Sequence, residues 1–509
     1  MIGIPMFKRH YISGMFSRWE SASVHVLGIV LLGLSASLVP SILYAVVNKE
    51  PLAPFIWPMA VGLTLSFFLT LLFKIPNRIK PVSGIFMIGL VWFAAIIFGM
   101  IPFILSGMSS VDALFESTSG FTTTGATTMT DIESWPSSIL LWRSMMQWIG
   151  GIAIIMIFLF VLPMIGFSGR TLFGNEMSGS GSGNFFARMK DAGKQFIVIY
   201  LILTAIMIII LMMSGVTLFD SLCMSFSTIS CGGFMCKGDS IAGYGTIVKI
   251  VLIIFMFLGG SNFYLHFRAM YHKKPLSYIR DEEFRAMFFW LAAMSLLVFF
   301  IIYEDDGLFG ENILNNFINT AFTVVSAGTT TGFAVVDYVS WPTAAVVLLF
   351  LIAAVGGSSA STAGGIKISR LIIIYRYERN GLRKLLHPKG VYDIKYNGSS
   401  LDDDTINATI IVTMAFTVTI MIGSIVLMLF GVGLGESVSS VIGCITTFGP
   451  AVGTFGPMGS YETMSPFIKV FLSLIMWMGR LEIVTALVLF TPGFWKEMMM
   501  THKKTRSRL

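Results

Sequence analysis

Long apolar runs separated by polar loops dominate the chain. A bilayer core is about 30 Å thick, so a spanning helix takes about 20 predominantly apolar residues. The runs lie near residues 24–47, 55–73, 82–105, 137–166, 195–215, 243–267, 286–303, 342–375, 406–431 and 465–494. The pattern therefore predicts an all-α polytopic membrane protein with ten candidate spans.

The run at 342–375 is too long for one straight crossing. As a single helix it would reach roughly 51 Å, at about 1.5 Å per residue. Its middle, residues 356–365, reads GGSSASTAGG. Glycine, serine and threonine are poor helix formers. We therefore expect this span to be broken at 356–365, with a simple packing kink as the alternative.

Loop charges predict the orientation of the spans. When the N-terminus is placed inside, basic residues fall in the inner loops and acidic residues in the outer loops. The inner basic residues include Lys74, Arg78, Lys80, Arg170, Arg188, Lys190, Lys194, Arg268, Lys273, Lys274, Arg280 and Arg285. The outer acidic residues include Asp112, Asp131, Glu133, Asp220, Asp239, Asp337 and Glu462. Because cytoplasmic loops carry the excess of Lys and Arg, both termini are predicted to be cytoplasmic.

Four semi-polar outer segments, each between two spans, resemble one another. They are VDALFESTSGFTTTGAT (111–127), FDSLCMSFSTISCGGFM (219–235), INTAFTVVSAGTTTGFA (318–334) and SSVIGCITTFGPAVGTF (439–455). We interpret them as short helices that enter from outside and return as extended chain. They align on Gly125, Gly233, Gly332 and Gly453. Gly232 competes with Gly233 in the second segment, and Gly449 is a weaker competitor in the fourth.

Helix caps support this alignment. The residues thirteen positions before the aligned glycines are Asp112, Asp220, Asn319 and Ser440. These residue types are favoured at helix N-caps. We therefore expect a short helix to start at each of them.

Repetition on this scale indicates four pseudo-equivalent units around a shared centre. Each unit consists of a span, a pore loop and a second span. The predicted division is a two-span extension at 1–80, repeat 1 at 81–192 and repeat 2 at 193–283. Repeat 3, with the break, follows at 284–403, and repeat 4 with a cytoplasmic tail at 404–509. The two N-terminal spans lie outside the repeats.

Irregular backbone at membrane depth is tolerated where protein buries it or where it lines a watery path. A helix that enters from outside points its partly negative C-terminal end inward, which favours a cation. The extended chain after it can offer carbonyl oxygens that replace an ion's hydration shell. A single glycine in a membrane protein more often serves helix packing. Four in register indicate a central cation pathway.

Composition excludes several classes of protein. Of the 509 residues, 55% are hydrophobic and 12% are charged, against about 25% charged in soluble domains. This argues against a soluble enzyme or a nucleic-acid-binding protein. The net charge of +7 is explained by the basic inner loops. The four cysteines, Cys223, Cys231, Cys236 and Cys444, lack metal-site spacing, and we interpret them as small apolar fillers.

Enzymatic alternatives have weaker support. Ser358 or Ser361 would be the nucleophile of an intramembrane protease, but the candidate histidine, His266, lies near the inner end of its span. No GxxxxGK[ST] phosphate-binding pattern occurs. We expect neither an enzyme nor a cofactor.

Several motifs resemble a known family. They are TTTGAT (122–127), WRSMMQWIGG (142–151), GGSNFYLHF (259–267), TTTGF (329–333), the break at 356–365 and GRLE (479–482). They resemble the Trk/Ktr/HKT potassium transporters over nearly the whole chain, and most closely the bacterial Trk-type translocating subunit. The resemblance implies transport across the bacterial inner membrane.

The resemblance also implies site residues. The implied potassium filter comprises Thr124, Gly125, Gly232, Gly233, Thr331, Gly332, Val452 and Gly453. Glycine rather than serine at position 125 favours potassium. The implied gate comprises Gly356, Gly357, Gly364, Gly365 and Lys367, with Arg480 as an electrostatic barrier. A salt bridge with Glu482 is the alternative for Arg480, and a structural role is favoured for Arg143.

The implied partners are potassium ion, membrane lipid, a second copy in a homodimer and a cytosolic ring of nucleotide-binding regulatory subunits. The basic loops 170–194 and 376–395 are candidate docking surfaces, although lipid headgroups also account for their charge. The main alternative function is a symporter that couples potassium to sodium or protons. It needs a second cation site, for which Glu482 is the one obvious buried acid. An organic-solute transporter is disfavoured because the repeats run parallel rather than inverted.

Overall fold

The computed structural model describes residues 18–73, 81–160, 182–303, 313–390 and 392–498. It is a bundle of long helices with one small antiparallel hairpin, β1 (Lys395–Tyr396) and β2 (Ser399–Ser400). The predicted all-α membrane class is confirmed. The predicted basic residues Lys74, Arg78, Lys80 and Arg170 lie outside the described residues.

Seven helical stretches in the described part of the chain are long and apolar enough to cross a membrane. They are α2 (Arg18–Ser37) with α3 (Val39–Asn48), α4 (Ala53–Leu72), α5 (Pro81–Leu105), α7 (Ser137–Phe160), α10 (Ser182–Met213), α15 (Glu282–Tyr303) and α19 (Asp403–Leu429). Two further pairs of helices are long and apolar enough when taken together, but each is sharply bent: α12 (Thr246–Gly259) with α13 (Phe263–Tyr271), by 95°, and α21 (Pro466–Arg480) with α22 (Ile483–Leu489), by 116°.

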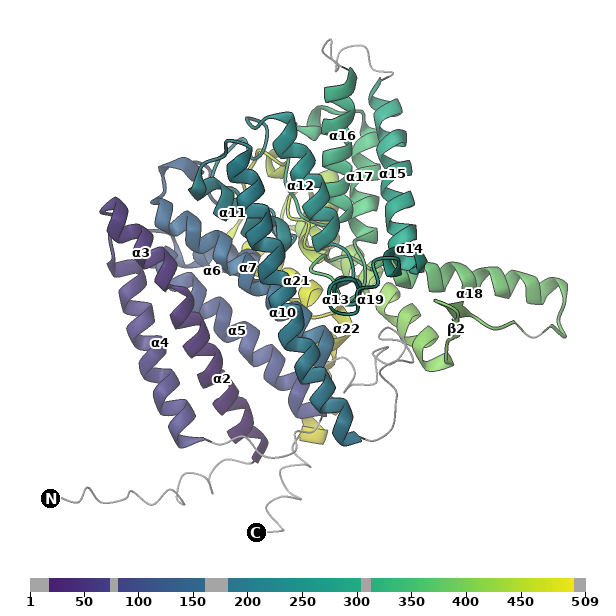
Figure 1. Ribbon diagram of the computed structural model, residues 1–509, viewed down its shortest axis with the longest axis horizontal. Helices are drawn as coiled ribbons and strands as arrows, with labels where there is room; N and C mark the ends of the chain where they lie inside the picture. The colour runs from purple at the N-terminus through teal and green to yellow at the C-terminus, as the bar shows by residue number, and fades with distance from the viewer. Residues whose placement is uncertain (1–17, 74–80, 161–181, 304–312, 391, 499–509) are drawn as a thin grey trace.

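The remaining predicted span is broken where the small residues lie. Helix α17 (Thr343–Val355) ends at the first glycine of the break, and α18 (Ile368–Leu386) begins after it. The predicted interruption of 342–375 is therefore confirmed. Helix α18 projects sideways from the bundle beside β2 (Figure 1). A one-turn helix, α14 (Ser277–Arg280), precedes α15.

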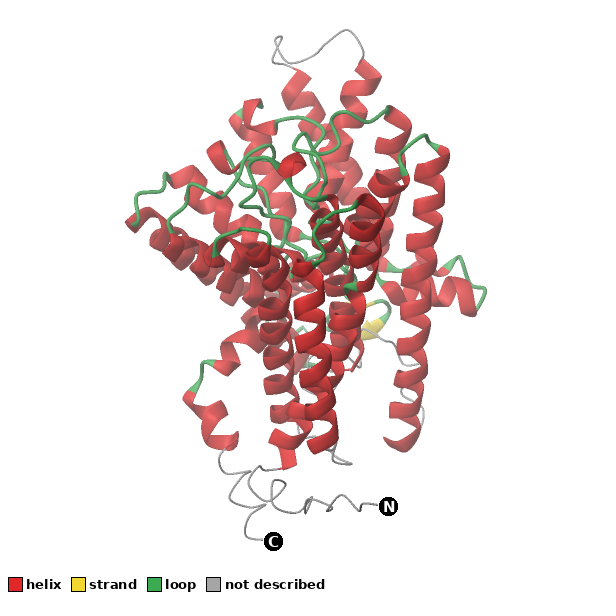
Figure 2. Cartoon of the chain, turned by 90° about the vertical axis from the view of Figure 1, so that its left-hand side faces the viewer, coloured by secondary structure: helices red, strands yellow, loops and turns green. Residues whose placement is uncertain are grey.

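Four shorter helices carry the segments that the sequence aligned. They are α6 (Ser110–Phe121), α11 (Leu218–Ile229), α16 (Ile313–Gly328) and α20 (Leu434–Ile445). Short 3-10 turns follow in three of the outer segments: η1 (Ile132–Ser134), η3 (Tyr338–Ser340) and η4 (Gly453–Phe455). Figure 2 shows the loops gathered toward the upper part of the bundle.

The predicted caps of these helices are wrong. Ser109 and Thr217 are the N-caps of α6 and α11, and their hydroxyls accept the N–H groups of Asp112 and Asp220. The carboxylates therefore lie in the first helical turn, where the positive end of the helix dipole favours them. The residues predicted for the other two caps lie inside α16 and α20.

The helices close into a circle. Each short helix packs against a spanning helix of the preceding unit: α11 on α7, α16 on α12 and α20 on α17. The fourth unit closes the circle, because α21 packs against α6. The predicted repeat boundaries at residues 80, 192, 283 and 403 stay a prediction.

The N-terminal pair α2 and α4 packs together at one side of the bundle and contacts α5 (Figure 1). Its outer surface exposes large apolar side chains such as Trp57 and Phe67. A contiguous apolar surface of this kind is unfavourable in water and suits a lipid environment.

Candidate functional site

Each short helix ends in the same backbone turn. A glycine with positive φ follows four residues after the last helical residue. These glycines are Gly125 (φ 85°), Gly233 (80°), Gly332 (85°) and Gly449 (93°). The residue two positions before each glycine also has positive φ; these are Thr123 (53°), Cys231 (52°), Thr330 (52°) and Thr447 (57°). The residue between them stays outside the left-handed region, so φ alternates in sign.

One hydrogen bond is common to all four turns. The residue before the glycine donates its N–H to the carbonyl oxygen five residues earlier. The bonds are Thr124 to Ser119 (2.8 Å), Gly232 to Ser227 (2.7 Å), Thr331 to Ser326 (2.8 Å) and Phe448 to Gly443 (2.9 Å). The four segments therefore share one local structure, although their sequences differ.

The four glycines form a closed ring. A Cβ atom built on any of them would lie closer than 3.0 Å to a carbonyl oxygen of the next segment. These oxygens belong to Gly232 for Gly125, Thr331 for Gly233, Phe448 for Gly332 and Thr124 for Gly449. Each oxygen belongs to the residue that precedes the next glycine, and the fourth segment meets the first. The close approach explains why a side chain is excluded at every ring position.

The ring corrects the alignment of the fourth segment. Gly449, not Gly453, occupies the fourth position. Gly453 begins η4, and a Cβ there would meet the side chain of Glu436. Val452 also lies off the ring, with its N–H bonded to Ser439 Oγ at 3.1 Å. The second segment follows the predicted register, since Gly233 has positive φ and Gly232 does not.

One side of the ring is open. On the side of the returning chains, an open cavity is lined by Gly125, Gly233, Gly332 and Pro450, with residues from all four segments. The ring therefore has an open approach from this side.

The opposite side of the ring is covered by the broken span. The hydroxyl of Thr362 lies 2.9 Å from the carbonyl oxygens of both Ile229 and Gly259. The N–H of Gly364 donates to Thr330 Oγ1 at 2.7 Å. A Cβ on Gly364 would clash with the carbonyl oxygen of Thr446. The loop 356–365 thus contacts the second, third and fourth segments directly below the ring.

The predicted gate residues form the two ends of this loop. Gly356 (φ 72°) and Gly365 (φ 78°) press against each other, so neither position has room for a side chain. A Cβ built on Gly357 would likewise collide with the Cβ of Ala363. Lys367 follows and its ammonium group donates to the carbonyl oxygen of Ala363. The structure brings these residues together, and their role as a gate stays a prediction.

Arg480 is buried beside the loop, with 3% of its surface exposed. Its Nη1 donates to the carbonyl oxygen of Thr362 at 2.8 Å, and its Nη2 to that of Gly150 at 3.4 Å. Glu482 pairs instead with Arg370, at 2.5 Å. The predicted alternative, an Arg480–Glu482 salt bridge, is therefore not formed, and the guanidinium lies against the loop.

Glu283, at the start of α15, escaped the sequence analysis. Its carboxylate accepts the N–H groups of Ser359 (2.7 Å) and Ser369 (3.2 Å) and the hydroxyl of Tyr396 (3.2 Å). Burial raises the pKa of Tyr396 well above its ordinary value, so its hydroxyl stays a donor. Glu283 thus connects the loop to the β1–β2 hairpin. Nothing in the local sequence distinguishes it from any acidic residue in a first helical turn.

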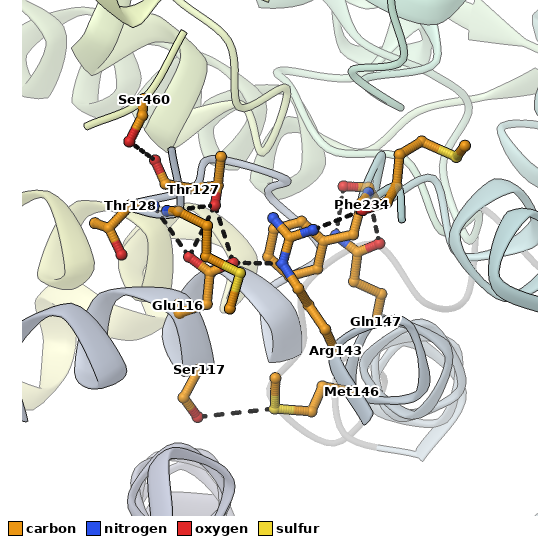
Figure 3. Close-up of polar contacts among 12 residues, drawn as sticks. Glu116, Ser117, Thr127, Thr128, Arg143, Met146, Gln147, Phe234 and Ser460 are labelled. Atoms are coloured by element: carbon orange, nitrogen blue, oxygen red, sulfur yellow. Dashed lines mark hydrogen bonds and ion pairs between the residues drawn. The ribbon is translucent and has the colours of Figure 1, made fainter. Parts of the chain in front are cut away.

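Behind the ring, Glu116, Arg143 and Gln147 contact the returning chains of the first two segments (Figure 3). The sequence indicated a structural role for Arg143 and did not identify the other two. Isolated polar residues in an apolar run are a signal, but their partners are 85 or more positions away for Arg143–Met235 and Gln147–Gly232.

The cysteine, serine and histidine side chains considered for metal binding or catalysis are buried within the fold. All four cysteines are buried and free. Ser358 contacts Met287, and Ser361 donates to the carbonyl oxygen of Ser358. His266 contacts Tyr278 and the carbonyl oxygen of Leu258. Among the described residues no cluster of three or more His, Cys, Asp or Glu could hold a metal ion.

Comparison with known proteins gives consistent results. The family model TrkH, described as a cation transport protein, matches residues 89–497. The chain is 33% identical to the Trk system potassium uptake protein TrkH of Salmonella typhimurium, over 83% of this chain and 89% of that protein. It is 32% identical to TrkH of Halomonas elongata, over 93% and 99%. The crystal structure of the potassium transporter TrkH from Vibrio parahaemolyticus superimposes with a TM-score of 0.85 at 28% identity, over 94% and 99% of the two chains.

Proposed function

This chain belongs to the TrkH family of cation transport proteins, and on that premise we propose that it is a channel-like pathway for potassium uptake. Its relatives are named as potassium uptake proteins. The observation that carries the proposal is the closed ring of four glycines, each facing a carbonyl oxygen of the next segment. Such a ring is built from backbone and needs no catalytic group.

Potassium enters the ring by exchanging water for carbonyl oxygens. The residue pairs that would supply them are Thr124–Gly125, Gly232–Gly233, Thr331–Gly332 and Phe448–Gly449. The C-terminal ends of α6, α11, α16 and α20 precede these pairs and carry partial negative charge, which favours a cation at the centre. The open cavity on the returning side admits the hydrated ion.

The loop 356–365, with Lys367 and Arg480, acts as the gate. It contacts three of the four segments from below. The positive charge of Arg480 against it opposes a cation that leaves the ring. Conduction requires the loop to move aside, and its run of small residues favours such mobility because the loop has no large side chain of its own to pack against its surroundings.

In the cell, this multi-pass protein would lie in the inner membrane with both termini in the cytoplasm. A homodimer and a cytosolic nucleotide-binding ring complete the proposed assembly. Helix α18 supports this assignment because it projects from the bundle and exposes Arg379, Arg383 and Lys384. A symporter is not favoured, since Glu482, the predicted second-site acid, is paired with Arg370.

Growth of cells that lack their own potassium uptake systems tests the proposal. We expect the native chain to support growth at low potassium, and Gly125→Ser to lower the preference for potassium over sodium. A side chain at Gly125 would displace the carbonyl of Gly232. Gly33→Ser is the control, because nothing lies within 4 Å of a Cβ there. Failure of the native chain to restore growth would refute potassium uptake, and an unchanged preference in Gly125→Ser would refute the filter.

A further inference from the structure

Three polar side chains tie the first two segments of the ring together from behind (Figure 3). Glu116 belongs to α6, and Arg143 and Gln147 lie one turn apart on α7. Glu116 and Arg143 form an ion pair whose side chains are 0% and 2% exposed. Gln147 is also fully buried.

Glu116 holds the first returning chain. Its carboxylate accepts the N–H of Thr128 at 3.1 Å and the hydroxyl of Thr127 at 3.1 and 3.2 Å. These residues follow Gly125 by two and three positions. The carbonyl oxygen of Thr127 in turn accepts the N–H of Tyr461, at 2.8 Å. The chain that leaves the first ring position is therefore fixed on both sides.

Arg143 and Gln147 hold the second returning chain. Nη1 of Arg143 donates to the carbonyl oxygen of Met235 at 2.9 Å, and its guanidinium lies 3.6 Å from the centroid of the Phe234 ring. Gln147 donates to the carbonyl oxygen of Gly232 at 2.6 Å and accepts the N–H of Phe234 at 3.0 Å. The amide of Gln147 thus grips the chain on both sides of Gly233.

The other segments are held mainly by hydroxyl groups and, in the fourth, also by the carboxylate of Glu436, which accepts the N–H and the hydroxyl of Thr454 at 3.4 Å. Tyr461 donates its hydroxyl to the carbonyl oxygen of Gly449 at 3.0 Å, and Tyr338 donates to that of Ala451 at 3.3 Å. Ser326 donates to Phe333 within the third segment. The first and second segments differ because a buried charge pair joins them. A buried ion pair is costly to desolvate and often no more stabilising than an apolar pair. Its position, with bonds to both chains beside the ring, indicates a geometric role.

We propose that Glu116, Arg143 and Gln147 form a brace that fixes the spacing between the first two filter segments and thereby determines cation selectivity. The proposal rests on the filter function proposed above and adds the residues that position it. None of the three touches the ion through its own side chain. A ring of carbonyl oxygens discriminates between ions by the size of its opening and by the field strength of its carbonyl dipoles. If the brace is loosened, the spacing of the first two segments changes and sodium is accepted as well as potassium.

Competition between potassium and sodium, measured as uptake per molecule of protein in the membrane, tests the brace. Gln147→Met removes both bonds to the second segment and leaves no buried charge unpaired. We expect its preference for potassium to fall roughly tenfold, the scale set by losing about one strong hydrogen bond. Uptake by the native chain, measured in parallel, tests the proposed function separately.

The ion pair is tested by Glu116→Gln, Arg143→Gln and the double variant. Each single variant strands a buried partner, so the amount of folded protein should fall. The double variant removes both charges and should recover the amount of protein without recovering selectivity. Glu282→Gln is the matched control, because Glu282 pairs with Arg376 between α15 and α18 and takes no part in the ring. The brace is refuted if the double variant or Gln147→Met selects potassium as well as the native chain, or if Glu282→Gln loses as much selectivity.

Discussion

At the scale of single residues, the ring positions are restricted to glycine by two independent constraints. The backbone lies in the left-handed region at all four, which costs a residue with a Cβ about 1–2 kcal/mol. A Cβ would also collide with a backbone carbonyl of the next segment. Gly453 satisfies only part of this description, since its neighbour is the movable side chain of Glu436.

The two candidate glycines of the fourth segment can be separated by substitution. We expect Gly449→Ala to abolish potassium uptake, because both the angle and the collision with Thr124 oppose it, at a cost above about 2 kcal/mol. Gly453→Ala should keep most of the native uptake, because Glu436 can move away. Uptake rates normalised to membrane protein provide the measurement. If Gly453→Ala lost more uptake than Gly449→Ala, Gly453 would be the functional glycine of the fourth segment.

At the scale of elements, the broken span couples the ring to the rest of the protein. The loop 356–365 is held from above by the ring segments, from the side by Arg480 and from below by Glu283. Glu283 also accepts the hydroxyl of Tyr396 in the hairpin. Movement of the hairpin or of α18 would therefore be transmitted to the loop through a short chain of hydrogen bonds.

Removal of the Arg480 side chain should open the potassium pathway. We expect Arg480→Met to raise potassium flux several-fold, since both the positive charge and the bond to the carbonyl oxygen of Thr362 are lost. Arg480→Lys keeps the charge and should stay closer to the native flux. Rubidium flux into vesicles that contain the purified protein would measure this. A flux in Arg480→Met equal to or below that of Arg480→Lys would contradict the barrier.

At the scale of the whole molecule, the circle of helices closes through contacts between the first and the fourth units. Helix α21 packs against α6, and Lys469 of α21 pairs with Asp112 of α6 at 2.5 Å. Closure places all four glycines around one centre. The charge pattern of the loops predicts which side of the membrane each face of this ring meets.

Thiol labelling tests that orientation. All four natural cysteines are buried, so the native chain should react weakly with a membrane-impermeant maleimide. In intact cells we expect Ser134→Cys, in the outer loop at η1, to react and Ser400→Cys, in the β1–β2 hairpin, to react only after the membrane is opened. Both positions are exposed. Labelling of Ser400→Cys in intact cells would contradict the predicted cytoplasmic location of the hairpin.

The sequence alone determined the membrane class, the broken span and three of the four ring glycines. These features depend on local composition: apolar runs of spanning length, a run of small residues, and the repeated TTTG together with SCGG. The fourth glycine also has a local signal, since TTFG (446–449) parallels TTTG, but TTFGPAVGTF contains a second candidate, Gly453. The end of α20 decides between the two.

The tertiary structure decided what depends on distant partners. Only the folded chain shows that Gly449 meets Thr124, that Glu116 pairs with Arg143 between two segments, and that Glu283 connects the loop to the hairpin. Periodicity and composition report how one element meets lipid or water. They do not indicate which backbone carbonyl, up to hundreds of residues away, lies within hydrogen-bonding distance.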